Sequence, residues 1–315
     1  MDIYSQIRKN NLHTWLVLTA FIALVLSIGT GLDYFYGGGL GMPFYTLISL
    51  AVGLGSSAGS YFFGDKIVLS STRAREADPD DLKEKQWMNV IEEMSIAAGI
   101  PMPKIYVIDD PDPNAFATGR DPQHSSIAIT RGLLETLNRE ELQAVAAHEM
   151  SHIKNLDIRL MLVVAVLVGS VALLADWARR SMFWGRRGRS SREDNRGGGA
   201  VILLIVWLAA VILAPILSRI IAMCVSRRRE YLADATGAEL TRNPLALASA
   251  LEKIEAHIHP TAAIHQGTAH LCIADPKGSL LDNREDWFAD LFSTHPPAHK
   301  RIEALRQMAY VKTGG

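Results

Sequence analysis

The sequence has few cysteines and no excess of charge of either sign. Only Cys224 and Cys272 are cysteines among its 315 residues, which is too few for a disulfide framework. The 32 basic and 33 acidic residues leave a net charge of −1, whereas nucleic-acid-binding domains are usually basic overall. We therefore expect no nucleic-acid partner. Intrinsic disorder is also excluded, because 49% of the residues are hydrophobic and such a chain can form a core.

The hydrophobic residues are concentrated in four blocks. The first two, at residues 12–32 and 40–63, have the length of about twenty residues that a helix needs to cross a bilayer. A secretory signal peptide is the alternative for the first block, but the apolar core of a signal peptide is shorter. Arg8 and Lys9 precede the pair and Lys66 follows it. The positive-inside rule then predicts a cytoplasmic N-terminus and a cytoplasmic chain after Lys66.

The other two blocks, at residues 160–175 and 200–217, flank an Arg-rich loop. If both blocks span the membrane, this loop faces outward, against the positive-inside rule. If they form a shallow hairpin, the loop stays in the cytoplasm, where it would bind anionic lipids. The sequence leaves both arrangements open.

The chain between the second and third blocks has the pattern of a small α+β domain. An amphipathic helix precedes three short β-rich runs that turn residues separate, which predicts a strand meander with helices on either side. These elements are expected at residues 80–99, 105–108, 115–118 and 126–130. From residue 226 onward the chain is predicted to be mostly helical again.

The strongest chemical signal is the HExxH sequence at residues 148–152, on a predicted helix that Asn138 caps. Two histidines four residues apart lie on one face of a helix, so His148 and His152 can bind one Zn²⁺ ion. Glu149, next to the first histidine, can act as a general base toward a water that the metal activates. The alternative is a pair of surface histidines on a polar helix face.

A zinc site of this kind needs a third protein ligand. The metzincin pattern requires Gly at position 155 and His at position 158, but the sequence has Asn155 and Ile158, which excludes that class. Glu230 is a candidate ligand from a later helix. Asp234 lies one turn further along the same face and could accept a hydrogen bond from a ligand imidazole. A solvated acidic pair on a helix surface is the alternative.

Three segments together, HEMSH, RREYLADATGA and STHPPAHKRI, closely resemble HtpX-type membrane zinc proteases, which are Glu-ligand zincins related to the CAAX prenyl proteases. The similarity covers nearly the whole chain. It implies one zinc ion per chain, with Glu230 as the third ligand and Asp234 supporting a ligand imidazole. It also implies that His295, as a donor to the oxyanion, and Arg301, which orients acidic groups, lie at the site.

The same resemblance identifies the segment NAFATG as a strand at the edge of the site. Asn114, Ala115 and Phe116 would begin the strand with which an extended substrate pairs. Because both ligand segments adjoin apolar blocks, the zinc site is expected near the cytoplasmic bilayer surface. Membrane proteins are therefore the expected substrates, and the family implies quality control and a stress response in the bacterial inner (plasma) membrane.

The sequence thus predicts a predominantly helical α+β protein, multi-pass in the membrane, with four apolar helices and a cytoplasmic zincin-like catalytic domain. Its expected parts are two membrane helices (1–65), a first catalytic segment (66–157), two further membrane segments (158–225) and a second catalytic segment (226–315). A CAAX-type processing protease and a non-catalytic scaffold with structural zinc are the two competing interpretations.

Overall fold

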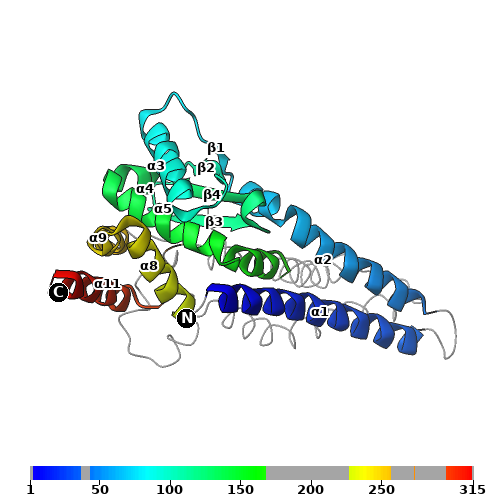
Figure 1. Ribbon diagram of the computed structural model, residues 1–315. Coiled ribbons are helices and arrows are strands. Elements are labelled where there is room, and N and C mark those ends of the chain that lie inside the picture. Colours follow the sequence, from blue (N-terminus) through cyan, green and yellow to red (C-terminus); the bar gives the residue numbers. More distant parts are fainter. Residues whose placement is uncertain (1–2, 37–42, 168–226, 257–272, 274–295, 314–315) are drawn as a thin grey trace, which may run out of the picture.

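The computed structural model describes residues 3–36, 43–167, 227–256, 273 and 296–313 (Figure 1). Two long helices, α1 (Ile3–Tyr36) and α2 (Phe44–Ser71), run antiparallel and extend from one side of a smaller part made of helices and one sheet. The windows Ile7–Ser27 and Phe44–Ser71 are long and apolar enough to cross a membrane. Most of the exposed large apolar side chains of the described chain lie on these two helices.

Asp33 of α1 joins the two long helices at the end remote from the sheet. Its carboxylate accepts hydrogen bonds from the backbone amides of Tyr45 and Thr46 at 2.9 and 2.8 Å. The first amides of a helix have no partner within that helix, so Asp33 supplies acceptors for the start of α2. This contact accounts for the one acidic residue between the first two apolar blocks.

Four strands form the sheet, in the order β1-β2-β4-β3. β2 is parallel to β4, and β3 is antiparallel to β4. The strands are β1 (Arg75–Glu76), β2 (Lys104–Ile108), β3 (Ala115–Gly119) and β4 (Ser125–Thr130). The three predicted strands are confirmed to within one residue at each end, and the two-residue β1 was not predicted.

The predicted meander is wrong. After β2, the polar segment 109–114 carries the chain past the position next to β2, so β3 forms one strand further out, at the edge of the sheet. A short 3₁₀ turn at Pro122–His124 then returns the chain, and β4 enters between β2 and β3. All six residues of β4 are buried, as a central strand covered on both faces requires.

The helices of the smaller part surround α5 (Arg139–Lys154), which packs on α3, α8, α9 and β3. Asn138 and Glu141 form a complete capping box at the start of α5, which confirms the predicted start of this helix. The predicted end of α3 at Gly99 is confirmed too, because Gly99 adopts the left-handed conformation with φ of 68° that favours glycine. The other helices are α3 (Leu82–Ala98), α4 (Arg131–Thr136), α8 (Arg227–Thr241), α9 (Pro244–Ala256) and α11 (Ala298–Thr313).

A single large core fixes α5 in place. Met150 and Ala147 of α5 are fully buried in the same cluster as Trp87 of α3 and Leu251 of α9. Each Å² of apolar surface that is removed from water contributes about 25 cal/mol to the free energy of folding. This core therefore holds the helix that carries HExxH rigidly against the sheet. The described chain is therefore predominantly helical with one small sheet, as predicted. Most of the third and fourth apolar blocks lies outside the described residues, and the proposed division into four parts stays a prediction.

Candidate metal centre

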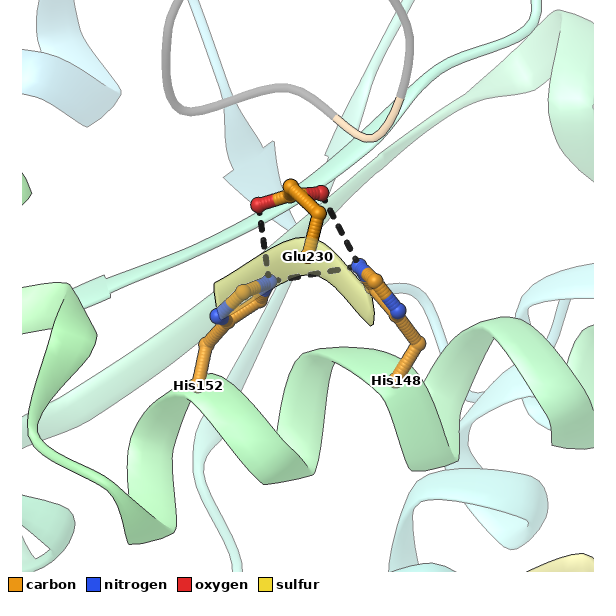
Figure 2. Close-up of side chains that lie close together, drawn as sticks. All are labelled: His148, His152 and Glu230. Atoms are coloured by element: carbon orange, nitrogen blue, oxygen red, sulfur yellow. Dashed lines mark hydrogen bonds and ion pairs between the residues drawn. The ribbon is translucent and has the colours of Figure 1, made fainter. Parts of the chain in front are cut away.

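Three side chains from two helices that are distant in the sequence meet at the centre of the smaller part. His148 and His152 point from one face of α5, and Glu230 reaches them from α8 (Figure 2). The two Nε2 atoms are 3.2 Å apart. The carboxylate of Glu230 lies 3.8 Å from Nε2 of His148 and 3.7 Å from Nε2 of His152. All three side chains are buried.

This donor set fits a zinc ion. Two nitrogen ligands of a tetrahedral zinc, each about 2.0–2.1 Å from the metal, stand roughly 3.3 Å apart, close to the 3.2 Å between the two Nε2 atoms. The candidate ligand atoms of His148, His152 and Glu230 all lie within 4.8 Å of one another. Two imidazoles and one carboxylate are the ligands of catalytic zinc sites that keep a fourth position for water or substrate.

The opposite nitrogen of each imidazole faces a carboxylate. Nδ1 of His148 lies 3.0 Å from Oδ1 of Asp234, and Nδ1 of His152 lies 3.1 Å from Oδ2 of Asp157. A proton on Nδ1 that is shared with a carboxylate leaves the Nε2 lone pair free for a metal. The hydrogen bond to Asp157 therefore holds the ring of His152 in the tautomer that metal binding needs, and Asp234 lies within ion-pair distance of the ring of His148.

Arginine side chains neutralise the two supporting carboxylates. Arg301 donates two hydrogen bonds to Asp234, at 2.8 and 2.7 Å. Burial alone would raise the pKa of Asp234, but the charge and hydrogen bonds of Arg301 have the larger effect and lower this pKa to about 2. Arg229 lies 3.7 Å from Asp157. Asp234 thus stays ionised, which keeps it an acceptor for the imidazole of His148.

Glu149 lies between α5 and the edge strand β3, beside the three candidate ligands. Burial raises the pKa of this carboxyl group to about 8, and the negative charge of Glu230 adds to the effect. The backbone amide of Ala117 in β3 donates to it. A buried carboxylate with a raised pKa has the proton affinity that a general base requires at neutral pH.

The predicted substrate residues lie at the beginning of β3. Asn114 exchanges backbone and side-chain hydrogen bonds with Thr130 at the end of β4, and Ala115 is the first residue of β3. β3 is an edge strand, and its outer side faces Glu149 at Ala117. Phe116, which pairs with Ala128 of β4, is buried in the smaller cluster between the sheet and α2.

Of the two remaining predicted site residues, Arg301 lies at the site and His295 is not among the described residues. Arg301, in the first turn of α11, lies 3.7 Å from Glu230 in addition to its contacts with Asp234. His295 lies outside the described residues, so its place relative to the ligands is not described; Pro296 and Pro297, which follow it, are buried.

Sequence reasoning missed two supporting residues. Asp157 follows His152 by five residues, which is more than one helical turn, and only the turn at residues 155–156 brings its carboxylate back to the imidazole. Asn10 of α1 donates to Asp157 over 2.6 Å. The sequence HIKNLD contains a signal for Asp157, because Asn155 ends a helix, but no local pattern connects Asn10 to residues almost half the chain away.

Comparisons with known proteins agree with this geometry. Residues 81–309 match the family described as peptidase family M48. The protease HtpX homologue of Caldanaerobacter subterraneus subsp. tengcongensis is 42% identical over 308 residues, which cover 97% of this chain and 98% of that protein. The protease HtpX homologue of Thermoanaerobacter pseudethanolicus is 43% identical over 306 residues, with 97% and 98% coverage.

The fold also has a counterpart among solved structures. The crystal structure of Ste24p from S. mikatae superposes with a TM-score of 0.51 at 18% sequence identity, and the match covers 96% of this chain and 67% of that chain. At this identity the likeness concerns the fold alone. The family match over most of the chain and the similarity to HtpX homologues along nearly its whole length show that this chain is a metallopeptidase belonging to peptidase family M48.

Proposed function

We propose that this protein is a zinc-dependent endopeptidase that cleaves membrane proteins at the cytoplasmic surface of the bacterial inner membrane, as part of protein quality control. The observation that carries the proposal is the position of Glu149, a buried carboxyl group, between the candidate ligands and the edge strand β3. A base, a metal-binding set and an edge that can pair with a peptide meet at one place.

Different residues of the chain would have different roles in peptide hydrolysis. His148, His152 and Glu230 would hold the zinc ion. When bound, zinc would supply a Lewis acid that lowers the pKa of a water molecule and polarises the scissile carbonyl group. Glu149 would take a proton from the attacking water and pass it to the leaving amine. His295, which lies outside the described residues, would donate to the oxyanion.

The edge of β3 suits an extended substrate. The backbone groups of alternate residues point away from β4, and a peptide could pair with them by strand addition along the segment that begins at Asn114, Ala115 and Phe116. One of these groups already has a partner, since the carbonyl of Ala115 accepts from the amide of Ile273 at 2.9 Å. A substrate would therefore either displace Ile273 or pair beside Ala117, whose amide already donates to Glu149.

The two long helices support a site close to the bilayer. Asn10, near the start of the apolar window Ile7–Ser27, contacts Asp157, which in turn faces the imidazole of His152. A metal centre two hydrogen bonds from a candidate membrane span would act on peptide segments near the lipid headgroups. Membrane proteins, or loops that emerge from the membrane, are the substrates that fit this position.

The cytoplasmic orientation is supported by the basic residues that flank the two long helices. Arg8 and Lys9 precede the apolar part of α1, and Lys66 lies near the end of α2, so the positive-inside rule places the catalytic part in the cytoplasm. A single cysteine at the exposed Lys85 of α3, with both native cysteines replaced by serine, tests this. Labelling of intact cells by an impermeant thiol reagent would contradict a cytoplasmic site.

The decisive experiment compares purified full-length protein with its Glu149→Gln variant. Both are incubated with Zn²⁺ and a membrane-protein substrate, and with unstructured casein as a soluble reference, and all fragments are identified by mass spectrometry. We expect the variant to bind zinc and to lose cleavage, because the amide cannot take the proton. Full activity in the variant would remove Glu149 from the chemistry.

The choice of substrate that is cleaved distinguishes the competing functions. Preferential cleavage of a prenylated peptide would favour a CAAX-type processing enzyme. Zinc binding without cleavage of any substrate would favour a structural scaffold. Four membrane helices, and a lipid-binding role for the Arg-rich loop, are further parts of the proposal; the loop and most of the third and fourth blocks lie outside the described residues.

A further inference from the structure

We infer that Asn10 of α1 is a positioning residue of the metal centre, which holds Asp157 against His152 so that the centre is complete only while α1 is docked. The inference rests on the proposed function, because it takes His148, His152 and Glu230 as metal ligands. It gives the first membrane helix a part in metal binding that neither HExxH nor the Glu230 motif contains.

The side-chain amide of Asn10 is saturated by groups around the metal centre. Its Nδ2 donates to Oδ1 of Asp157 at 2.6 Å and to the backbone carbonyl of Asn155 at 2.9 Å. Its Oδ1 accepts from Arg229 at 3.2 Å. Asn10 is only 1% exposed, so these partners replace water, and each buried hydrogen bond would be costly to lose.

The two oxygens of Asp157 connect Asn10 to a metal ligand. Oδ1 accepts from Asn10, and Oδ2 faces Nδ1 of His152 at 3.1 Å. A carboxylate held at one oxygen cannot rotate freely about its χ2 bond, so Asn10 fixes the plane in which the other oxygen meets the imidazole. This is the kind of contact, one step beyond a ligand, that sets the orientation and basicity of a metal-binding histidine.

Anchoring of α1 by itself does not account for Asn10. The neighbouring Asn11 accepts from Arg159 at 2.7 Å, and this contact attaches α1 to the same part of the protein without touching the ligands or their carboxylates. Thr14, one turn after Asn10 and also buried, bonds back to the carbonyl of Asn10 within α1. A polar side chain buried in an apolar helix is expensive, and among these three only Asn10 contacts the carboxylate that faces His152.

The amide group meets requirements that other side chains do not. Leucine has the same number and branching of side-chain heavy atoms but neither donor nor acceptor, so it would release Asp157 and the carbonyl of Asn155. Aspartate has the same shape and keeps the acceptor for Arg229, but it cannot donate, and it would bring a second carboxylate against Asp157. Both substitutions should let the Asp157 carboxylate turn away from His152.

Zinc affinity of the full-length protein in detergent tests the inference without relying on activity. We would measure Zn²⁺ binding by competition with a chromophoric chelator for wild type, Asn10→Leu, Asn10→Asp and the matched control Asn11→Leu. The visible spectrum of the Co²⁺-loaded proteins reports ligand geometry in the same samples. We expect both Asn10 variants to lose about 10- to 100-fold in affinity and to change the Co²⁺ bands, and Asn11→Leu to stay within about threefold of wild type.

A double variant shows whether Asn10 acts through Asp157. In an Asp157→Ala background the carboxylate is absent, so adding Asn10→Leu should change the zinc affinity by less than about twofold. If Asn10→Leu does not fold, Asn10→Asp, which keeps the packing, decides the single-variant comparison, and it replaces Asn10→Leu in the double variant.

Three outcomes would overturn the inference. Equal zinc affinities for the Asn10 variants and Asn11→Leu would reduce Asn10 to a packing residue, as would unchanged Co²⁺ bands. A full loss that persists in the Asp157→Ala background would show that Asn10 acts by another route. If wild type itself binds no zinc, the proposed function falls and the inference falls with it, whereas tight binding by wild type and all variants removes the inference alone.

Discussion

Gly237 of α8 lies directly against the backbone of His148 in α5. A Cβ atom added at Gly237 would stand 3.1 Å from the backbone nitrogen of His148 and 3.3 Å from its Cα. Side chains on facing helices usually keep the two axes about 8–10 Å apart, and a glycine permits the closer approach. Because Glu230 is two turns before Gly237 on the same helix, this contact sets how near the third ligand comes to the two imidazoles.

Replacing Gly237 with alanine should weaken metal binding more than folding. The added methyl group would push α8 from α5 by a few tenths of an ångström and carry Glu230 with it, so we expect zinc affinity to fall by about tenfold. Alanine also favours the helix by about 1 kcal/mol relative to glycine, which offsets the packing cost. Chelator competition measures the first effect and thermal unfolding the second. Gly55→Ala in α2, where a Cβ meets nothing within 4 Å, is the control; similar affinities for the two variants would contradict the prediction.

Removing the metal should destabilise the protein. The ligands come from α5 and from α8, which are separated by a long stretch of chain, so a bound ion joins two segments that the unfolded chain does not hold together. Zinc at a hundred times its dissociation constant adds about 2.7 kcal/mol to the free energy of unfolding. We expect a chelator to lower the midpoint of thermal unfolding, and added Zn²⁺ to restore it. The same treatment of Glu230→Ala should have little effect, and an equal shift in that variant would place the metal elsewhere.

Replacing Arg301 with methionine should destabilise the fold and the metal site together. Arg301 and Asp234 are each 2% exposed and form a bidentate pair. Loss of one partner leaves a buried charge, at a cost of about 3–5 kcal/mol in the free energy of unfolding. Asp234 would also lose the arrangement in which it faces Nδ1 of His148. Arg301→Lys keeps the charge but not the fork of donors, so its loss should be intermediate; full stability of Arg301→Met would show that the pair contributes nothing.

A buried carboxylate that pairs with two arginines, away from the metal site, predicts a pH dependence. Arg75 and Arg131 both donate to the fully buried carboxylate of Glu84 in α3, at 2.7 and 2.8 Å. The hydrogen bonds of Arg75 hold the pKa of Glu84 below its ordinary value of 4.5. The carboxylate therefore stabilises the fold at pH values above about 4.5, and this contribution is lost as the pH falls through the lowered pKa.

Substituting glutamine for Glu84 should thus destabilise the protein by about 1–3 kcal/mol at pH 7, and by progressively less as the pH falls below 4.5. Unfolding midpoints measured between pH 3 and pH 8 would show the difference from wild type narrowing in acid. Glu93→Gln is the control, because Glu93 pairs with Arg139 on the exposed surface, where ion pairs contribute about 0–1 kcal/mol. A difference for Glu84→Gln that does not change with pH would contradict the role of its charge.

Local elements of this protein could be predicted from the sequence because the signals for them are local. The capping box of Asn138 and Glu141 starts α5, and the helical period then places His148 and His152 on one face. Gly99 ends α3 in the same way. Strand boundaries follow from runs of β-branched residues between turn residues. The order of the strands could not be read, because it depends on where β4 is best buried and not on any residue within β3.

The sequence by itself determined which side chains could bind a metal and which one could act as a base. Those roles follow from residue chemistry and from spacing along a helix, together with a motif around Glu230 that resembles a known family. Only the tertiary structure decided what surrounds those residues. The turn at residues 155–156 returns Asp157 to His152, and the first part of α1 lies beside this turn so that Asn10 reaches Asp157. Such contacts join parts of the chain up to 147 positions apart, and they form because packing of apolar surfaces, which has no sequence pattern at that distance, brings the helices together.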